Sequence, residues 1–180
     1  MTLLETYHRY DNLLNREFTA TRPNQKWVTD VTFVATQQGW GYLSTIKDLF
    51  DGFIVAHEFG RQNSQALVNK TLQKAAQNEK VTAELLLHSD QRYQYTSQAY
   101  FVLTQQYTIT PSMSRQGNCW DNAPMESFFG HLKEEALRQV RKPSFEKARQ
   151  IIDEYIRFYN YERIQLKTRQ TPFETRCLST

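Results

Sequence analysis

The 180-residue chain has few of the residues that build covalent or metal-bound scaffolds, with only two cysteines and four histidines. A disulfide framework needs several cysteines, and a zinc site needs Cys or His residues clustered at ligand spacing. The four histidines (8, 57, 88 and 131) are scattered along the chain, and neither cysteine has an obvious partner. The sequence therefore gives little support to a zinc enzyme, a Ser-His-Asp hydrolase or a Cys-His hydrolase.

Long apolar runs are also missing. No stretch approaches the roughly 20 residues that a membrane-spanning helix needs, and none has the shape of a secretory signal. The expected protein is cytoplasmic, makes no membrane contact and keeps its thiols reduced. Six glycines and five prolines exclude collagen-like and linker-like chains, while 39% hydrophobic residues are enough for the buried core of one domain.

Charge is mildly positive, with a formal net charge of +3. The excess is concentrated near the C-terminus, because residues 131–180 hold 11 bases and 7 acids whereas residues 1–130 hold 11 bases and 12 acids. Such a distribution permits a polyanionic partner. The sequence leaves open whether this basic region follows phosphates or is a solvated surface.

Hydrophobic patterning predicts an α/β fold. Residues 1–26 are polar and without sustained periodicity, so we expect an N-terminal arm there. Strand formers then occur in five segments: residues 27–34, 40–46, 53–59, 81–87 and 107–111. Helical periodicity begins near Ser64, Ser97, Asn122 and Ser144. Three meandering strands followed by alternating helices and strands predict a mixed five-stranded sheet with helices on both faces.

Three carboxylates stand where a purely structural explanation is weak. Asp30 interrupts a run of strand formers, and an ionised carboxylate in a buried strand is costly unless a cation or donors compensate it. Asp90 follows the apolar segment 85–87 directly, at the strand end where ligand sites of α/β sheets lie. Glu126 falls in the first turns of a predicted helix, with Lys133 two turns later on the same face. Each residue also has an ordinary structural explanation. Asp30 could lie at a solvated strand edge, Asp90 could be a turn or helix-capping residue, and Glu126 could simply interact with the helix dipole.

Taken together, the three acids match the needs of two-metal phosphoryl transfer. Hard divalent cations prefer oxygen ligands, and a pair of them activates the attacking oxygen and stabilises the leaving one. The loop before Glu126 carries Arg115, Asn118 and Trp120, whose donors and aromatic ring are suited to binding a phosphate backbone or stacking on a base. For Trp120 a place in the core stays open, and for Asn122 we favour a helix cap. Asp48, Asp51 and Asp121 are interpreted as turn or helix-flanking residues.

Three segments also resemble a known family. They are Trp27-Val28-Thr29-Asp30-Val31-Thr32, His88-Ser89-Asp90 with Gln94-Tyr95, and the long run from Ser112 to Phe129 that contains Gly117-Asn118-Cys119-Trp120-Asp121-Asn122. These segments resemble the catalytic core of insertion-sequence transposases of the IS3 type, which belong to the retroviral-integrase superfamily with a ribonuclease-H-like fold. Asp90 and Glu126 are separated by 35 residues, the spacing of this D,D,E group.

The resemblance implies that Asp30, Asp90 and Glu126 hold two Mg²⁺ or Mn²⁺ ions and that Lys133 contacts DNA near the cleavage point. It implies hydrolytic nicking of DNA at the ends of the element, followed by attack of the freed 3′-hydroxyl on another phosphodiester. A homo-oligomer on DNA is expected, because two ends are cut. The corresponding domain assignment is an arm at 1–26, an integrase-like catalytic core at 27–142, and a C-terminal helix and tail at 143–180 that complete the core.

Two departures from the family pattern keep an alternative open. The family usually has glycine two residues after the second aspartate, where this chain has Arg92, so we expect backbone strain beside the metal site. Residues 1–26 also cannot supply the helix-turn-helix that reads the element ends. The alternative is a truncated, catalytically weak remnant that binds DNA or a full-length transposase.

Overall fold

The computed structural model describes residues 7–179. Its centre is one five-stranded sheet in the order β3-β2-β1-β4-β5. The strands are β1 (Lys26–Thr36), β2 (Gly39–Asp48), β3 (Ile54–Gly60), β4 (Leu86–Ser89) and β5 (Thr110–Met113). The first three pair antiparallel, whereas β4 pairs parallel with both β1 and β5. The predicted mixed five-stranded sheet is therefore confirmed.

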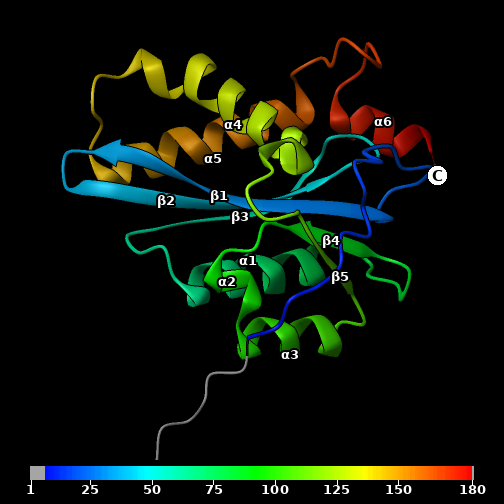
Figure 1. Cartoon of the computed structure of the whole chain (residues 1–180). Helices are drawn as coiled ribbons and strands as arrows, with labels where there is room; N and C mark the ends of the chain where they lie inside the picture. The colour runs from blue at the N-terminus through cyan, green and yellow to red at the C-terminus, as the bar shows by residue number, and fades with distance from the viewer. Residues whose placement is uncertain (1–6, 180) are drawn as a thin grey trace, which may run out of the picture.

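Helices cover both faces of this sheet (Figure 1). One face carries α1 (Gln65–Asn78), α2 (Tyr93–Thr96) and α3 (Gln98–Gln106), and the other carries α4 (Ala123–Glu135) and α5 (Phe145–Tyr161). A short α6 (Pro172–Leu178) follows near the C-terminus, and two 3-10 turns, η1 (Cys119–Asn122) and η2 (Leu137–Gln139), flank α4. Among residues 7–179, none of the helices combines the length and the apolar character that crossing a bilayer requires.

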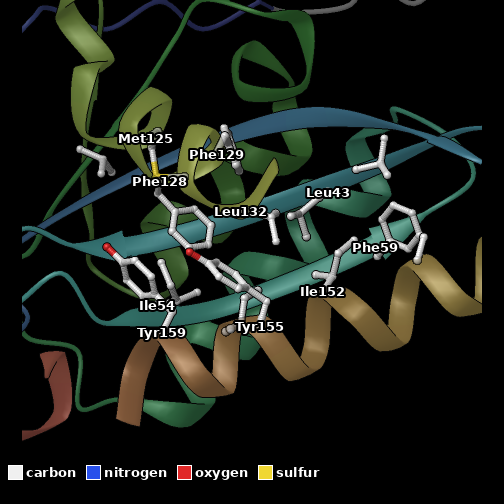
Figure 2. Close-up of a cluster of buried hydrophobic side chains, with 14 of the residues drawn as sticks. Leu43, Ile54, Phe59, Met125, Phe128, Phe129, Leu132, Ile152, Tyr155 and Tyr159 are labelled. Atoms are coloured by element: carbon white, nitrogen blue, oxygen red, sulfur yellow. The ribbon is translucent and has the colours of Figure 1, made fainter. Parts of the chain in front are cut away.

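The two faces of the sheet have separate cores because side chains of a strand alternate between them. Val28 and Val34 of β1 face α4 and α5, while Trp27 and Val31 face α1 and α3. Figure 2 shows the first core, in which side chains from α4, from the strands and from α5 converge. The α4 residues that anchor it, Met125, Phe128 and Leu132, are fully buried. This packing fixes α4 against β1, the two elements that carry most of the candidate site.

Some element boundaries differ from the sequence-based expectation. The strand expected at 81–87 lies at Leu86–Ser89, because the chain forms a turn in which the Leu85 amide donates to Thr82. The strand expected at 107–111 lies at Thr110–Met113, after Thr108 turns the chain with φ of 56°. Neither α2 nor α6 was expected. As a result, β4 ends directly before Asp90, and β5 runs alongside it to Met113.

The residues before β1 have no helix or strand from position 7 to position 25, and they pack against the domain. Leu14 is buried in the α4–α5 core. Backbone bonds join the segment to distant parts of the chain, since the His8 amide donates to Thr96 and the Met113 amide donates to Asp11. This segment therefore contributes to the edge of the domain near β5.

Candidate active site

Two of the predicted acids come from neighbouring parallel strands: Asp30 lies near the middle of β1, and Asp90 directly follows the last residue of β4. Val28 of β1 is in register with His88 of β4, so Asp30 and Asp90 each lie two residues beyond a paired position. Both side chains are largely buried, with 14% of Asp30 and 23% of Asp90 exposed. Parallel pairing thus brings together residues that are 60 positions apart in the sequence.

Arg92 joins these two aspartates. Its Nε lies 2.9 Å from Oδ2 of Asp90, and its Nη1 lies 3.4 Å from Oδ1 of Asp30. The same Nη1 donates to the carbonyl oxygen of Val31 at 3.0 Å, and the Arg92 amide donates to Asp90 at 2.9 Å. The guanidinium of Arg92 therefore supplies a positive charge between the two carboxylates.

The expectation of backbone strain at Arg92 is wrong. Arg92 has φ of −62° and ψ of 152°, which is ordinary extended backbone open to any residue. It takes this conformation because it precedes the first turn of α2. What distinguishes Arg92 in this loop is the placement of its charged side chain.

The two aspartates are electrostatically unfavourable as ions. Burial raises the pKa of Asp30 to about 7, and the negative charges of Asp90 and Glu126 act in the same direction, while Arg92 opposes them. Burial also raises the pKa of Asp90, with the amide and charge of Arg92 acting against the shift. Both shifts arise mainly because burial disfavours the ionised carboxylates, a cost that a bound cation would offset.

Glu126 lies in the first turn of α4 and is exposed, and among the described residues it makes no ion pair or hydrogen bond. Its charge nevertheless contributes to the raised pKa of Asp30, which places it in the same electrostatic neighbourhood. Within residues 7–179, no three Asp, Glu, His or Cys side chains lie close enough together to hold a metal ion as they stand. The three carboxylates are therefore neighbours with Arg92 between two of them, and the arrangement is not a closed ligand cage.

The donor chemistry fits a hard divalent ion. All three groups offer carboxylate oxygens, which Mg²⁺ and Mn²⁺ prefer. The guanidinium shows that the space between Asp30 and Asp90 accepts a cation. Glu126 is exposed, and its charge acts on Asp30, so it is the third carboxylate on this side of the sheet.

The loop before α4 is held by a buried ion-pair centre. Asp121 is 1% exposed and pairs with Arg115 at 3.0 Å and Arg16 at 2.8 Å. Hydrogen bonds from Arg115 hold the pKa of Asp121 well below its usual range. Asp121 therefore ties the loop to Arg115 and to the segment before β1. Its interpretation as a helix-flanking residue did not include these ion pairs, because Arg16 lies 105 positions away in the sequence.

The predicted DNA contacts fall on two surfaces. Arg115 and Asn118 line a hollow of about 520 Å³ that also includes Asp90 and Arg92. Trp120 is 70% exposed, which excludes the core position that had stayed open for it. Lys133 lies two turns along α4, where its Nζ is 5.1 Å from the centre of the Phe33 ring and burial lowers its pKa.

Asn122 does not cap α4, although that was the favoured interpretation. It occupies the N-cap position without making a capping hydrogen bond, and its Nδ2 donates to the carbonyl oxygen of Thr29 at 3.3 Å. This bond ties the start of α4 to the β1 residue next to Asp30. The bond therefore keeps the start of α4, which carries Glu126, next to the segment of β1 that carries Asp30.

Tyr95 of α2 is a further buried group near the acids. Its ring is fully buried, and its pKa is raised well above the usual range by burial and by the negative charges of Asp30 and Asp90. The aromatic position could be recognised in the sequence, but its neighbours could not. Tyr95 serves to pack α2 behind the acidic residues.

The chain matches the models of a known protein family and several related proteins. Two models described as "Integrase core domain" match residues 20–119 and 107–164. A transposase-like protein of Haemophilus influenzae is 44% identical over 163 residues, which are 91% of this chain and 75% of that protein. The insertion element IS600 31 kDa protein of Shigella sonnei is 46% identical over 153 residues. The putative transposase InsK for IS150 of Escherichia coli is 39% identical over 166 residues.

The match to the IS600 protein includes 84% of this chain, and the match to InsK includes 92%. The chain nevertheless spans only 56% and 59% of the lengths of those two relatives. Among solved structures, a chain of the simian T-cell lymphotropic virus intasome aligns over 97% of this chain and 60% of its own, with a TM-score of 0.77 and 14% identity. The HTLV-2 integrase catalytic core solved with magnesium aligns over 87% of this chain and 99% of its own, with a TM-score of 0.71 and 15% identity. These structures share the fold of this chain.

Proposed function

Since the chain belongs to the integrase core domain family and its relatives include insertion-element transposases, we propose that it is the catalytic core of a DNA transposase. The proposed reactions are metal-dependent nicking of DNA at the ends of an insertion element and strand transfer by the freed 3′-hydroxyl. The observation that carries the proposal is the contact of Asp30 on β1 and Asp90 at the end of β4 with one cationic group, the guanidinium of Arg92. Glu126 is the proposed third acid.

In this proposal Asp30, Asp90 and Glu126 supply the oxygen ligands for two Mg²⁺ or Mn²⁺ ions. When bound, such ions activate the attacking oxygen and stabilise the leaving oxygen of an in-line displacement. The magnesium in the HTLV-2 integrase structure supports the choice of metal. Asp30 and Asp90 suit this role because their burial makes them poor sites for uncompensated charge and good sites for a cation.

The chemistry needs no covalent intermediate with a side chain. In the nicking step the oxygen of water bonds to phosphorus, the bond from phosphorus to O3′ breaks, and O3′ takes up the proton. In strand transfer the 3′-hydroxyl attacks a second phosphodiester, and the displaced oxygen receives the proton. The chain contributes position: Arg115 and Asn118 line the hollow beside Asp90, and Lys133 supplies positive charge farther along α4.

Arg92 favours a second candidate, which is a chain that binds DNA and cuts it weakly. The guanidinium already compensates Asp30 and Asp90, so a metal ion must displace it. Oligomerisation on DNA belongs to both candidates and is part of the proposal. The two candidates differ in turnover and agree in DNA binding.

The deciding experiment is a nicking and strand-transfer assay with Mn²⁺ and oligonucleotides that copy the ends of the insertion element encoding this chain. We expect Asp90→Asn and Glu126→Gln to abolish product while leaving the chain folded, and Asp90→Asn should not lower the melting temperature, because burial raises the pKa of Asp90. Activity that survives either substitution would reject the acidic triad. Metal-dependent DNA binding without product in the unmodified chain would select the second candidate.

Glu146→Gln is the matched control for Glu126→Gln. Both glutamates lie in the first turn of a helix, so both substitutions remove the same favourable interaction with the helix dipole. Glu146 lies on α5 and forms an exposed ion pair with Arg149 at 3.6 Å. Loss of activity in both variants would show that helix stability, and not the acidic cluster, is being measured.

A further inference from the structure

A groove with exposed aromatic side chains lies at the opposite end of α4 from Glu126. It has a volume of about 540 Å³ and is lined by the β1–β2 hairpin on one side and by the chain that leaves α4 on the other. Figure 1 shows these two segments at the same end of the molecule. Phe33 and Trp40 line the groove with 57% and 56% of their surfaces exposed.

The two rings form a preorganised apolar surface. Their centroids are 5.1 Å apart and their planes meet at 84°, which is the edge-to-face geometry that aromatic pairs favour. The hairpin fixes them, because Trp40 is in register with Ala35, two residues from Phe33 on the same face of the strand. More than half of the surface of each ring stays exposed in this arrangement.

Positive charge surrounds these rings. Lys133, Arg138 and Lys142 line the groove, and Glu134 is its only acid within the described residues. Glu134 pairs with Arg138 at 2.6 Å, whereas Lys133 makes no ion pair among the described residues and lies over the Phe33 ring. Aromatic faces beside uncompensated cations are the combination that binds bases together with their phosphates.

The groove also lies at a defined distance from the acidic cluster. Phe33 follows Asp30 by three residues of β1, which is about 10 Å along a strand. Lys133 follows Glu126 by seven residues of α4, again about 10 Å along a helix. Measured along the backbone, both elements give the same spacing, which equals about three steps of 3.4 Å in a DNA strand whose bases stay stacked.

We propose that this groove binds unpaired nucleotides of the DNA substrate, with bases against Phe33 and Trp40 and phosphates beside Lys133 and Lys142, about three nucleotides from the phosphodiester at the acidic cluster. The inference rests on the proposed function for its substrate. It adds a single-strand binding site that would hold the frayed or unpaired end of the DNA during cutting and joining. The charge around the rings favours a polyanion over an apolar protein segment as the occupant.

The test compares two labelled duplexes, one blunt and one carrying three unpaired thymidines at its 3′ end, by fluorescence anisotropy in EDTA. We expect Phe33→Ala and Trp40→Ala each to weaken binding of the overhang duplex by about tenfold, the usual range for loss of one stacked base. Binding of the blunt duplex should change by less than about twofold. Trp40→Phe should retain most of the preference, because it keeps an aromatic face.

A second measurement reports stacking directly. Trp27 is fully buried, so in a Trp120→Phe background Trp40 is the one exposed indole. The overhang duplex should quench its fluorescence more strongly than the blunt duplex. Phe158→Ala, which removes a ring that is 40% exposed on α5, is the matched control and should leave the overhang preference intact.

Equal losses for blunt and overhang DNA would overturn the inference and leave a nonspecific basic surface. Unchanged DNA binding with altered sedimentation of the Phe33→Ala or Trp40→Ala variants would also overturn it, because the groove would then be an interface between protein chains. The assay contains no divalent metal, so it is independent of the chemistry. Overhang preference without metal-dependent nicking would reject the proposed function alone, and nicking without overhang preference would reject this inference alone.

Discussion

Removing the Arg92 side chain should increase the affinity of the acidic cluster for divalent metal. Arg92 contacts both Asp90 and Asp30, at 2.9 and 3.4 Å, and a metal ion at that position must break both contacts. The Arg92 side chain is 49% exposed, so each ion pair contributes about 0.5–1 kcal/mol after solvent screening. A total of about 1–2 kcal/mol corresponds to about 5- to 30-fold in the dissociation constant.

The assay is calorimetric titration of Mn²⁺ into Arg92→Ala and into the unmodified chain at pH 8, where Asp30 is mostly ionised. Arg9→Ala is the matched control, because Arg9 is an exposed arginine that lines the same hollow and contacts neither aspartate. We expect tighter binding only in Arg92→Ala. Equal affinities in all three proteins would refute the idea that the guanidinium and the metal compete for one position.

The same substitution separates the two functional candidates. If Arg92 limits turnover by occupying the metal position, Arg92→Gly should raise the nicking rate at low Mn²⁺ and have little effect at saturating Mn²⁺. The backbone at position 92 has ordinary dihedral angles, so glycine offers no relief of strain there. A rate that rises equally at all Mn²⁺ concentrations would point to the loop conformation and against competition.

Two stability predictions follow from buried charges. Asp30→Asn should stabilise the chain at pH 8 by on the order of 2–4 kcal/mol, because the raised pKa of about 7 means that folding disfavours the ionised carboxylate. The gain should shrink as the pH falls from 7 toward 4, since Asp30 then becomes protonated in both states; thermal melts across that range measure it, and a constant difference would contradict the assignment. Arg176→Ala should destabilise by about 3–5 kcal/mol in urea unfolding, because Arg176 is 13% exposed and pairs with the buried Asp48 and Asp51 and with Glu79. Arg149→Ala, which breaks an exposed pair, should change stability by less than about 1 kcal/mol, and equal effects of the two substitutions would contradict the difference in burial.

The proximity of Asp30 and Asp90 could be predicted because the sequence carries a local signal for each. Asp30 stands inside a strand pattern, and Asp90 ends an apolar segment, so the sheet topology brings them together without knowledge of any side-chain conformation. The contact of Arg92 with both acids depends on where α2 begins and on the rotamer of a long side chain. Neither has a local signal in the sequence, which is why backbone strain was expected in place of charge compensation.

Long-range pairing limited the rest of the prediction. Asp48 and Asp51 have the pattern of turn residues, but they are buried against Arg176, more than 120 positions away. The helix α6 was missed although its start has a recognisable capping box, formed by Thr171 and Glu174 with Pro172 between them. The burial of Asp48 and Asp51 against Arg176 depends on the fold, whereas the start of α6 could have been predicted from the sequence.

The spacing between the acidic cluster and the aromatic groove yields a final prediction, on overhang length. Both sites are built on β1 and α4, and the buried side chains of Phe128 and Leu132 hold these elements at fixed relative positions. The distance between the sites is therefore set by strand and helix geometry and not by a flexible loop. Extending the 3′ overhang from one to three thymidines should strengthen binding, and extending it from three to six should add little, as measured by anisotropy in EDTA. A single unpaired nucleotide that gave the full gain would place the stacked base at the acidic cluster itself and would contradict the spacing, whereas a steady gain through six would indicate that phosphate charge, and not the pair Phe33 and Trp40, determines the preference.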